Sequence, residues 1–134
     1  MDLVDRIRDS LNSIPNLPAK VIIGYMQPNE TIGLYPLPGS KVINEDWAGN
    51  QTKHINYEVA IRTQDSQLAN DSLWKISNYL EQLENIESED NSFQFERIKQ
   101  NGLPSISQQD AQGYTVFMLD FFVEIITNSK NESR

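Results

Sequence analysis

The side chain best suited to catalysis in this chain is the imidazole of His54, its one histidine. A nucleophilic triad or dyad would have to use it, because the sequence has no cysteine and no second histidine to act as the base. His54 lies at the start of an alternating segment, on the side that carries polar residues and next to Lys53. This setting predicts an exposed structural histidine, and we expect neither a catalytic residue nor an enzyme.

Carboxylates are the other groups that could do chemistry. Glu87, Glu89 and Asp90 cluster, but they lack the acid spacing and glycine of a calcium loop, which predicts a solvated helix end. Asp120 and Glu124 share one strand face but lie about 13 Å apart, too far for two carboxyls to act on one bond. The scattered glycines form no phosphate-binding motif. We therefore expect no metal site and no cofactor.

The elements that must position these groups follow from the hydrophobic period. Apolar residues at helical spacing predict helices over 2–14 and 66–86. Alternating or β-branched segments predict five strands, near 20–26, 31–35, 54–62, 93–96 and 114–127. The first two strands are expected to pair as a hairpin around Pro28 and Asn29. Prolines and glycines interrupt the period and predict loops over 36–51 and 101–113.

This element order predicts an α+β fold, a mostly antiparallel four- or five-stranded sheet with two helices packed on one face. Each helix has a single apolar stripe, so each can cover the sheet from one side only. The expected core residues are Leu3, Ile7, Leu11, Leu73, Ile76, Leu80, Leu83, Leu119, Phe121 and Val123. We expect residues 1–134 to form a single domain, with 128–134 as a disordered tail.

The sheet face away from the helices has a mixed character. On the last strand, large side chains alternate with the core set: Tyr114, Val116, Met118, Phe122 and Ile126. Asp120 and Glu124 lie among them. A monomer would carry polar residues on a wet face, so the pattern predicts burial against another subunit. The alternative is that the N-terminal helix or the 36–51 loop folds over this face within one chain.

The expected loop over 36–51 contains Glu45, Asp46 and Trp47. A loop of this length in a compact domain is usually functional or flexible, and we expect it to be poorly ordered in an isolated subunit. An indole is costly to leave in water, so Trp47 contacts either another subunit or its own core.

The charge and the longest apolar runs limit the partners. A net charge of -8 repels phosphate, which disfavours sequence-specific binding of nucleic acid. The acidity serves solubility or, alternatively, forms a wall past which DNA slides without sticking. No apolar run reaches the ~20 residues that span a bilayer, and the start lacks the layout of a signal peptide. We expect no membrane partner, and a protein made in the cytoplasm or assembled into something made there.

Several segments together carry a family resemblance. They are Gly24-Tyr25-Met26-Gln27-Pro28, Ile32-Gly33-Leu34-Tyr35-Pro36-Leu37-Pro38-Gly39, Tyr57-Glu58-Val59-Ala60-Ile61-Arg62-Thr63, Leu73-Trp74-Lys75-Ile76-Ser77-Asn78-Tyr79-Leu80 and Gly113-Tyr114. In this order, over about residues 3–127, the chain resembles the minor capsid proteins of siphophages and prophages of Gram-positive hosts. Those proteins are related to tail terminators such as that of phage lambda.

The resemblance implies a non-enzymatic structural protein of the virion. It implies a hexameric ring at the head-proximal end of the tail, which ends tail-tube growth and docks the head. The implied partners are further copies of the chain, the tail-tube protein and the head connector protein, with DNA only as passing cargo. The region of Glu45 and Asp46 is then a candidate for contact with the tube or the lumen. Two alternatives stay open: a head-completion or connector protein, and a host regulatory module that binds a peptide.

Overall fold

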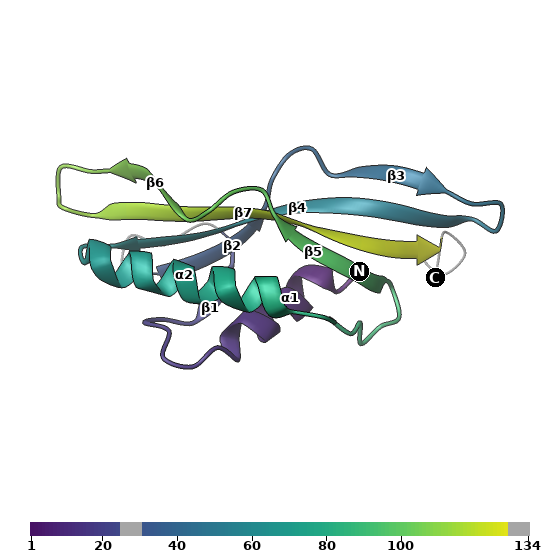
Figure 1. The fold of residues 1–134 in the computed structure, drawn as a ribbon, viewed down its shortest axis with the longest axis horizontal. Coiled ribbons are helices and arrows are strands. Elements are labelled where there is room, and N and C mark those ends of the chain that lie inside the picture. Colours follow the sequence, from purple (N-terminus) through teal and green to yellow (C-terminus); the bar gives the residue numbers. More distant parts are fainter. Residues whose placement is uncertain (25–30, 129–134) are drawn as a thin grey trace.

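The computed structural model describes residues 1–24 and 31–128 (Figure 1). The elements in chain order are α1 (Leu3–Asn12), β1 (Val21–Ile23), β2 (Thr31–Pro36), β3 (Lys41–Glu45), β4 (Asn50–Thr63), α2 (Ser66–Gln82), β5 (Gln94–Gln100), β6 (Ser105–Gln109) and β7 (Thr115–Asn128). Asn128 belongs to β7, and the remainder of the expected tail, 129–134, lies outside the described residues. The expected turn at Pro28 and Asn29 also lies outside them.

Two long antiparallel strands, β4 and β7, form the spine of the sheet. They pair along their whole length, from Asn50 opposite Asn128 to Thr63 opposite Thr115. β2 and β3 both pair with β4, while β5 and β6 both pair with β7. Because a strand has two edges, β3 lies on one edge of the spine and β6 on the other. Figure 1 shows these two strands at opposite ends of the long axis.

Both helices cover the same face of this sheet, as predicted (Figure 1). α1 packs on β1 and β2, and α2 packs on β4, β5 and β7. The predicted core residues are buried, except Leu83, which is half-buried. The α+β class is therefore confirmed, although the sheet has seven strands: the path β1-β2-β4-β7-β5 plus β3 and β6.

The expected hairpin of the first two strands is wrong, because β1 pairs with β2 in parallel. Val21 lies opposite Ile32, and Ile23 opposite Leu34. The side-chain amide of Asn12 completes the other edge of β1: its Nδ2 donates to the Val21 carbonyl (3.1 Å), and its Oδ1 accepts from the Val21 amide (2.7 Å). The apolar pattern of a short strand is the same in either direction, so the sequence could not reveal this orientation.

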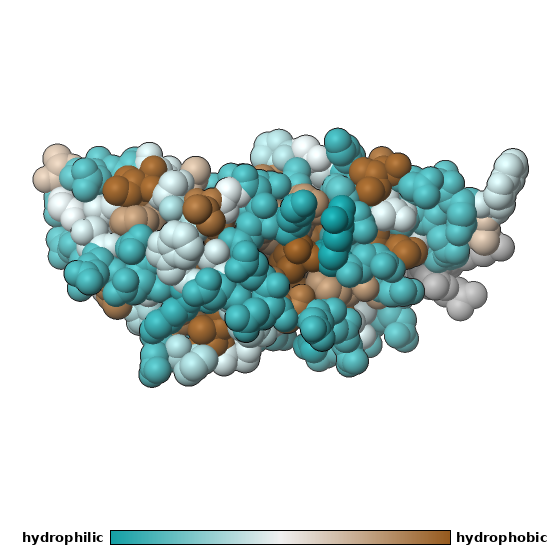
Figure 2. All heavy atoms as spheres, viewed as in Figure 1, coloured by the Kyte–Doolittle hydropathy of each residue, from teal (hydrophilic) through white to brown (hydrophobic). Residues whose placement is uncertain are grey.

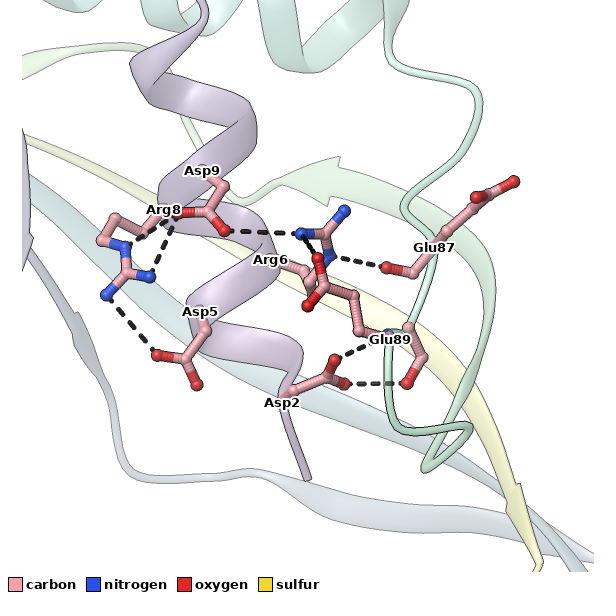
Figure 3. Close-up of polar contacts among 8 residues, drawn as sticks. Asp2, Asp5, Arg6, Arg8, Asp9, Glu87 and Glu89 are labelled. Carbon is pink, nitrogen blue, oxygen red and sulfur yellow. Dashed lines mark hydrogen bonds and ion pairs between the residues drawn. The ribbon is translucent and has the colours of Figure 1, made fainter.

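The second helix is shorter than predicted. It ends at Gln82 because Leu83 takes an extended backbone, which lets Ile86 reach the core. The chain after it is tied to α1 (Figure 3): Arg6 Nε donates to the Glu87 carbonyl (2.8 Å) and Arg6 Nη1 pairs with Glu89 (2.7 Å). The acids Glu87, Glu89 and Asp90 are exposed, as the sequence predicts, but they lie beyond the end of the helix, in a segment held to α1.

Two strands form inside segments expected to be loops. β3 lies within 36–51 and β6 within 101–113. All residues of both strands are exposed, so neither shows the alternation that marks a half-buried strand. Each forms a hairpin with the strand that follows it, β3 with the first part of β4 and β6 with the first part of β7. The sequence missed them because their exposed residues leave no apolar alternation and lie among prolines and glycines. No helix among the described residues has the length and apolar character needed to cross a membrane.

Candidate assembly surfaces

The β3–β4 hairpin presents an apolar surface that the subunit itself does not cover. The indole of Trp47, at its tip, has 106% of its reference exposure. Val42 and Ile43 are also exposed, as is every residue of β3. The register of β3 on β4 shifts between Val42 and Asn44, which leaves Ile43 outside the regular pairing. Trp47 therefore does not pack on its own core, which was one of the two alternatives for it.

The turn that carries Trp47 is ordered by a dense set of hydrogen bonds. Asp46 Oδ1 accepts from the amides of Ala48 and Asn50 (2.9 Å each), and Asp46 Oδ2 accepts from Asn50 Nδ2 (2.9 Å). The bond from the Asn50 side chain is the main cause that lowers the pKa of Asp46. Asn128 on β7 donates from Nδ2 to Asn50 Oδ1 (2.7 Å) and fastens the turn to the spine. None of these bonds uses the indole of Trp47.

A second apolar surface lies on the opposite edge of the sheet. Leu103, in the connection from β5 to β6, is 68% exposed, and Ile106 on β6 is 55% exposed. Figure 2 shows hydrophobic patches over β3 and over β6, at opposite ends of the molecule. The two exposed apolar surfaces thus lie on different parts of one subunit.

Beside Leu103 the surface is hollowed into a groove of about 390 Å³ between the end of α2, β5 and the β5–β6 connection. Its lining residues are Leu80, Glu81, Ile98, Lys99, Gln100, Gly102 and Leu103. A reciprocal pair fixes the distance between two of its walls: Ser77 Oγ donates to Gln100 Oε1 (2.5 Å), and Gln100 Nε2 donates to the Ser77 carbonyl (2.9 Å). The groove is thus apolar at its base and bordered by Glu81 and Lys99.

The sheet face away from the helices holds the five large residues singled out on the last strand. Val116 is 6% exposed, whereas Tyr114, Met118, Phe122 and Ile126 are half-buried. Charged side chains from the same subunit lie over two of them, Arg62 over Tyr114 and Arg97 over Phe122. Neither α1 nor β3 covers this face, since α1 packs on the other side and β3 extends the sheet at its edge. These residues stay candidates for a subunit interface.

His54 is half-buried on this face, not exposed as predicted. Its ring stacks on Phe122 with 4.3 Å between centroids, and its Nε2 lies 2.8 Å from Glu124 Oε1. Arg97 also reaches Glu124 (3.4 Å), and the guanidinium of Arg62 lies over the Tyr114 ring at 3.7 Å. The hydrogen bond from His54 is the main cause that lowers the pKa of Glu124. His54 therefore has a packing role over the strand, and no group of three or more metal-ligating side chains occurs in the part of the chain that the structure describes.

A pair of acids on the same face was not anticipated. The register of β4 on β7 places Glu58 directly opposite Asp120, and Tyr35 on β2 donates its hydroxyl to Glu58 Oε2. Asp120 Oδ1 is buried. Burial is the main cause that raises the pKa of Asp120 to about 6, with the hydrogen bond and charge of Glu58 adding to it. Two acids inside apolar strands were visible in the sequence, but their pairing depends on a register that the sequence does not show.

A comparison with known protein families agrees with the resemblance noted from the sequence. A family model described as bacteriophage tail terminator protein matches residues 8–126. A search of curated proteins returned no match. The matched range covers the second half of α1, all of α2 and every strand except the last residues of β7, so it includes the hairpin, the groove and the acid pair. The chain belongs to the bacteriophage tail terminator family, a family of structural proteins of the phage tail.

Proposed function

We propose that the protein forms a hexameric ring at the head-proximal end of the tail, where it ends growth of the tail tube and docks the head connector. The observation that carries this proposal is the presence of two exposed apolar surfaces on opposite edges of one sheet. One is the β3–β4 hairpin with Trp47, and the other surrounds Leu103 and Ile106. A closed ring needs two different surfaces on each subunit that fit one another, whereas a two-fold dimer needs one.

The sheet face away from the helices supplies a further contact. Met118, Phe122 and Ile126 are large and only half-buried, so covering them with a neighbouring subunit removes apolar area from water. The charged side chains around them, such as Arg97 and Glu124, would form the rim of such an interface. In this arrangement Glu45 and Asp46 lie at the tip of the β3–β4 hairpin, on the side of the subunit joint toward the lumen of the ring or the tail tube.

Passing DNA is the cargo of this ring and not a ligand. A net charge of -8 per subunit repels the phosphate backbone, so DNA would move through the ring without specific binding.

The test is electron microscopy of the purified protein mixed with its tail-tube protein. We expect ring-shaped particles, and tubes that stop growing and carry one ring at one end. Tubes that grow equally long with and without the protein, with bare ends, would contradict the proposal.

Phe122→Asp tests the contribution of the outer sheet face. We expect the variant to keep its circular dichroism spectrum but to lose assembly with itself or with the tube. Asn78→Asp, which adds the same charge on the exposed side of α2, is the matched control and should assemble normally. Unfolding of Phe122→Asp would mean that this face is internal core, and normal assembly would exclude it as an interface.

A further inference from the structure

We infer that the joint between neighbouring subunits is a hairpin-in-groove contact, in which Trp47 of one copy enters the groove between α2 and β5 of the next copy. This inference rests on the proposed ring and names the residues that would close it. Trp47 is the side chain that inserts, and Leu80, Ile98 and Leu103 line the groove that receives it. We call the subunit that supplies Trp47 the donor and the subunit that supplies the groove the acceptor.

The topology supports a contact between copies and not within one. β3 flanks the spine on the β4 edge, while β5 and the β5–β6 connection flank it on the β7 edge. The two central strands therefore separate the hairpin of a subunit from its own groove. Each copy can donate one hairpin and accept another, which is the head-to-tail arrangement that generates a ring.

The area that Trp47 exposes is enough for the central side chain of an interface, but not for a whole interface. A buried tryptophan removes about 150–250 Å² from water, against the roughly 800 Å² that each partner buries in a standard interface. Trp47 can thus supply the centre of the contact but not all of it. Val42 and Ile43 on the donor and Ile106 on the acceptor are exposed apolar residues beside this centre, so they extend the contact along both sheet edges.

The charges on the hairpin and on the rim of the groove favour a second copy of the chain as the occupant of the groove, in one orientation. The hairpin carries Glu45 and Asp46 beside Trp47. The rim of the groove carries Glu81 on the α2 side and Lys99 on the β5 side, where Lys99 lies opposite Phe122, so the acids of the hairpin fit the groove only when they meet its β5 side. Lys99 makes no ion pair with another residue in ranges 1–24 and 31–128. In a chain of net charge -8, neighbouring copies repel one another overall, so a local acid-to-lysine contact selects the approach in which hairpin meets groove.

The hydrogen-bonded turn gives the hairpin the rigidity that such an anchor needs. The side chain of Asp46 and the amide of Asn50 hold the turn closed, and Asn128 fastens it to β7. An ordered turn loses little conformational entropy when it binds, so more of the contact energy appears as affinity. These bonds hold in place an indole that makes no contribution to the core of its own subunit.

Two exposed positions allow a test that leaves the subunit folded. Trp47→Ser removes the side chain that inserts and Leu103→Arg blocks the groove, and neither residue is part of the core. Trp74→Ser, at a partly exposed site on α2, is the control for loss of a tryptophan. We measure oligomeric state by sedimentation velocity and light scattering, with circular dichroism to verify folding. We expect each of the first two variants to weaken self-association by roughly 30-fold or more, and the control to assemble like the unmodified protein.

Mixing the two variants gives the sharper result. The Leu103→Arg subunit keeps an intact hairpin and the Trp47→Ser subunit keeps an intact groove, so one good joint remains. We expect the mixture to form heterodimers and no larger species. Charge reversal adds a second test: Glu45→Lys and Lys99→Glu should each weaken assembly, and the double variant should regain it.

Each outcome separates this inference from the proposed function. If Trp47→Ser forms rings and caps tubes like the unmodified protein, the inference is wrong and the proposed function stands. If Trp47→Ser forms rings but no longer caps tubes, the indole binds the tail tube and a second copy is excluded. Absence of heterodimers in the mixture would also overturn the inference. If the unmodified protein forms no ring and caps no tube, both proposals fail.

Discussion

Replacing Asp120 by asparagine should make the subunit more stable at neutral pH and leave it almost unchanged in acid. Asp120 faces Glu58 across the β4–β7 spine, and the Tyr35 hydroxyl donates to Oε2 of Glu58. Burial, with the neighbouring acid, raises the pKa of Asp120 from 3.8 to about 6. An ionised Asp120 is therefore less well accommodated in the folded chain than in water.

The direction of the pH dependence of stability follows from how many protons the folded and unfolded chains bind. Between about pH 4 and pH 6 the folded chain holds a proton that the unfolded chain has released, so stability is present below pH 4 and is lost as pH rises through 6. The full pKa difference corresponds to about 3 kcal/mol. Because the carboxyl is partly open to water, solvent screening reduces the expected loss to about 1–2 kcal/mol. Asparagine carries no proton in this range and avoids that loss.

The assay is urea unfolding at pH 4, 6 and 8, followed by circular dichroism at low protein concentration and extrapolated linearly to water. The difference between variant and unmodified protein removes the contributions of other acids. We expect Asp120→Asn to gain about 1–2 kcal/mol at pH 8 and close to nothing at pH 4. Glu124→Gln is the control of opposite sign, because the pKa of Glu124 is lowered and its charge favours the folded chain.

Two results would refute this reasoning. The first is a variant that is less stable than the unmodified protein at pH 8. The second is a stability difference that stays constant from pH 4 to pH 8, which would show that the effect comes from packing and not from the proton.

Further predictions concern the core, the helix start and the histidine. Leu73→Ala should lose about 2–5 kcal/mol in urea unfolding because Leu73 is fully buried, whereas Trp74→Ala on the exposed side of α2 should lose much less. Asp65→Ala should lose about 1 kcal/mol, since the Asp65 carboxylate caps α2 by accepting from the Leu68 amide (3.1 Å); an unchanged urea midpoint would contradict that role. His54→Ala should leave the subunit folded and able to assemble, with a small loss of stability from the lost stacking on Phe122 and the lost bond to Glu124; failure to cap tail tubes by a folded variant would show a functional role for the imidazole.

Local patterns in the sequence were enough for the helices, the core and the long strands. Leu73, Ile76 and Leu80 recur at helical spacing and are buried, because the side of a helix that a residue occupies depends only on its neighbours in the chain. The alternation through Val59 and Phe121 predicted the core side of β4 and β7 for the same reason. These short-range signals sufficed for the α+β class and for the resemblance to a tail terminator.

Local patterns of this kind could not predict the contacts that depend on the tertiary fold. The parallel direction of β1 and the extended backbone from Leu83 onward depend on partners elsewhere in the fold. β3 and β6 were missed for a different reason: they pair with the strands that follow them directly, but all their residues are exposed and show no alternation. The candidate assembly surfaces also depend on the tertiary fold. Glu58 meets Asp120 through the β4–β7 register, and Leu80 and Leu103 share a groove because α2 packs on β5. Composition and spacing identified Trp47 as an unusual residue, but the tertiary structure placed it on an ordered turn, exposed, on the sheet edge opposite a groove.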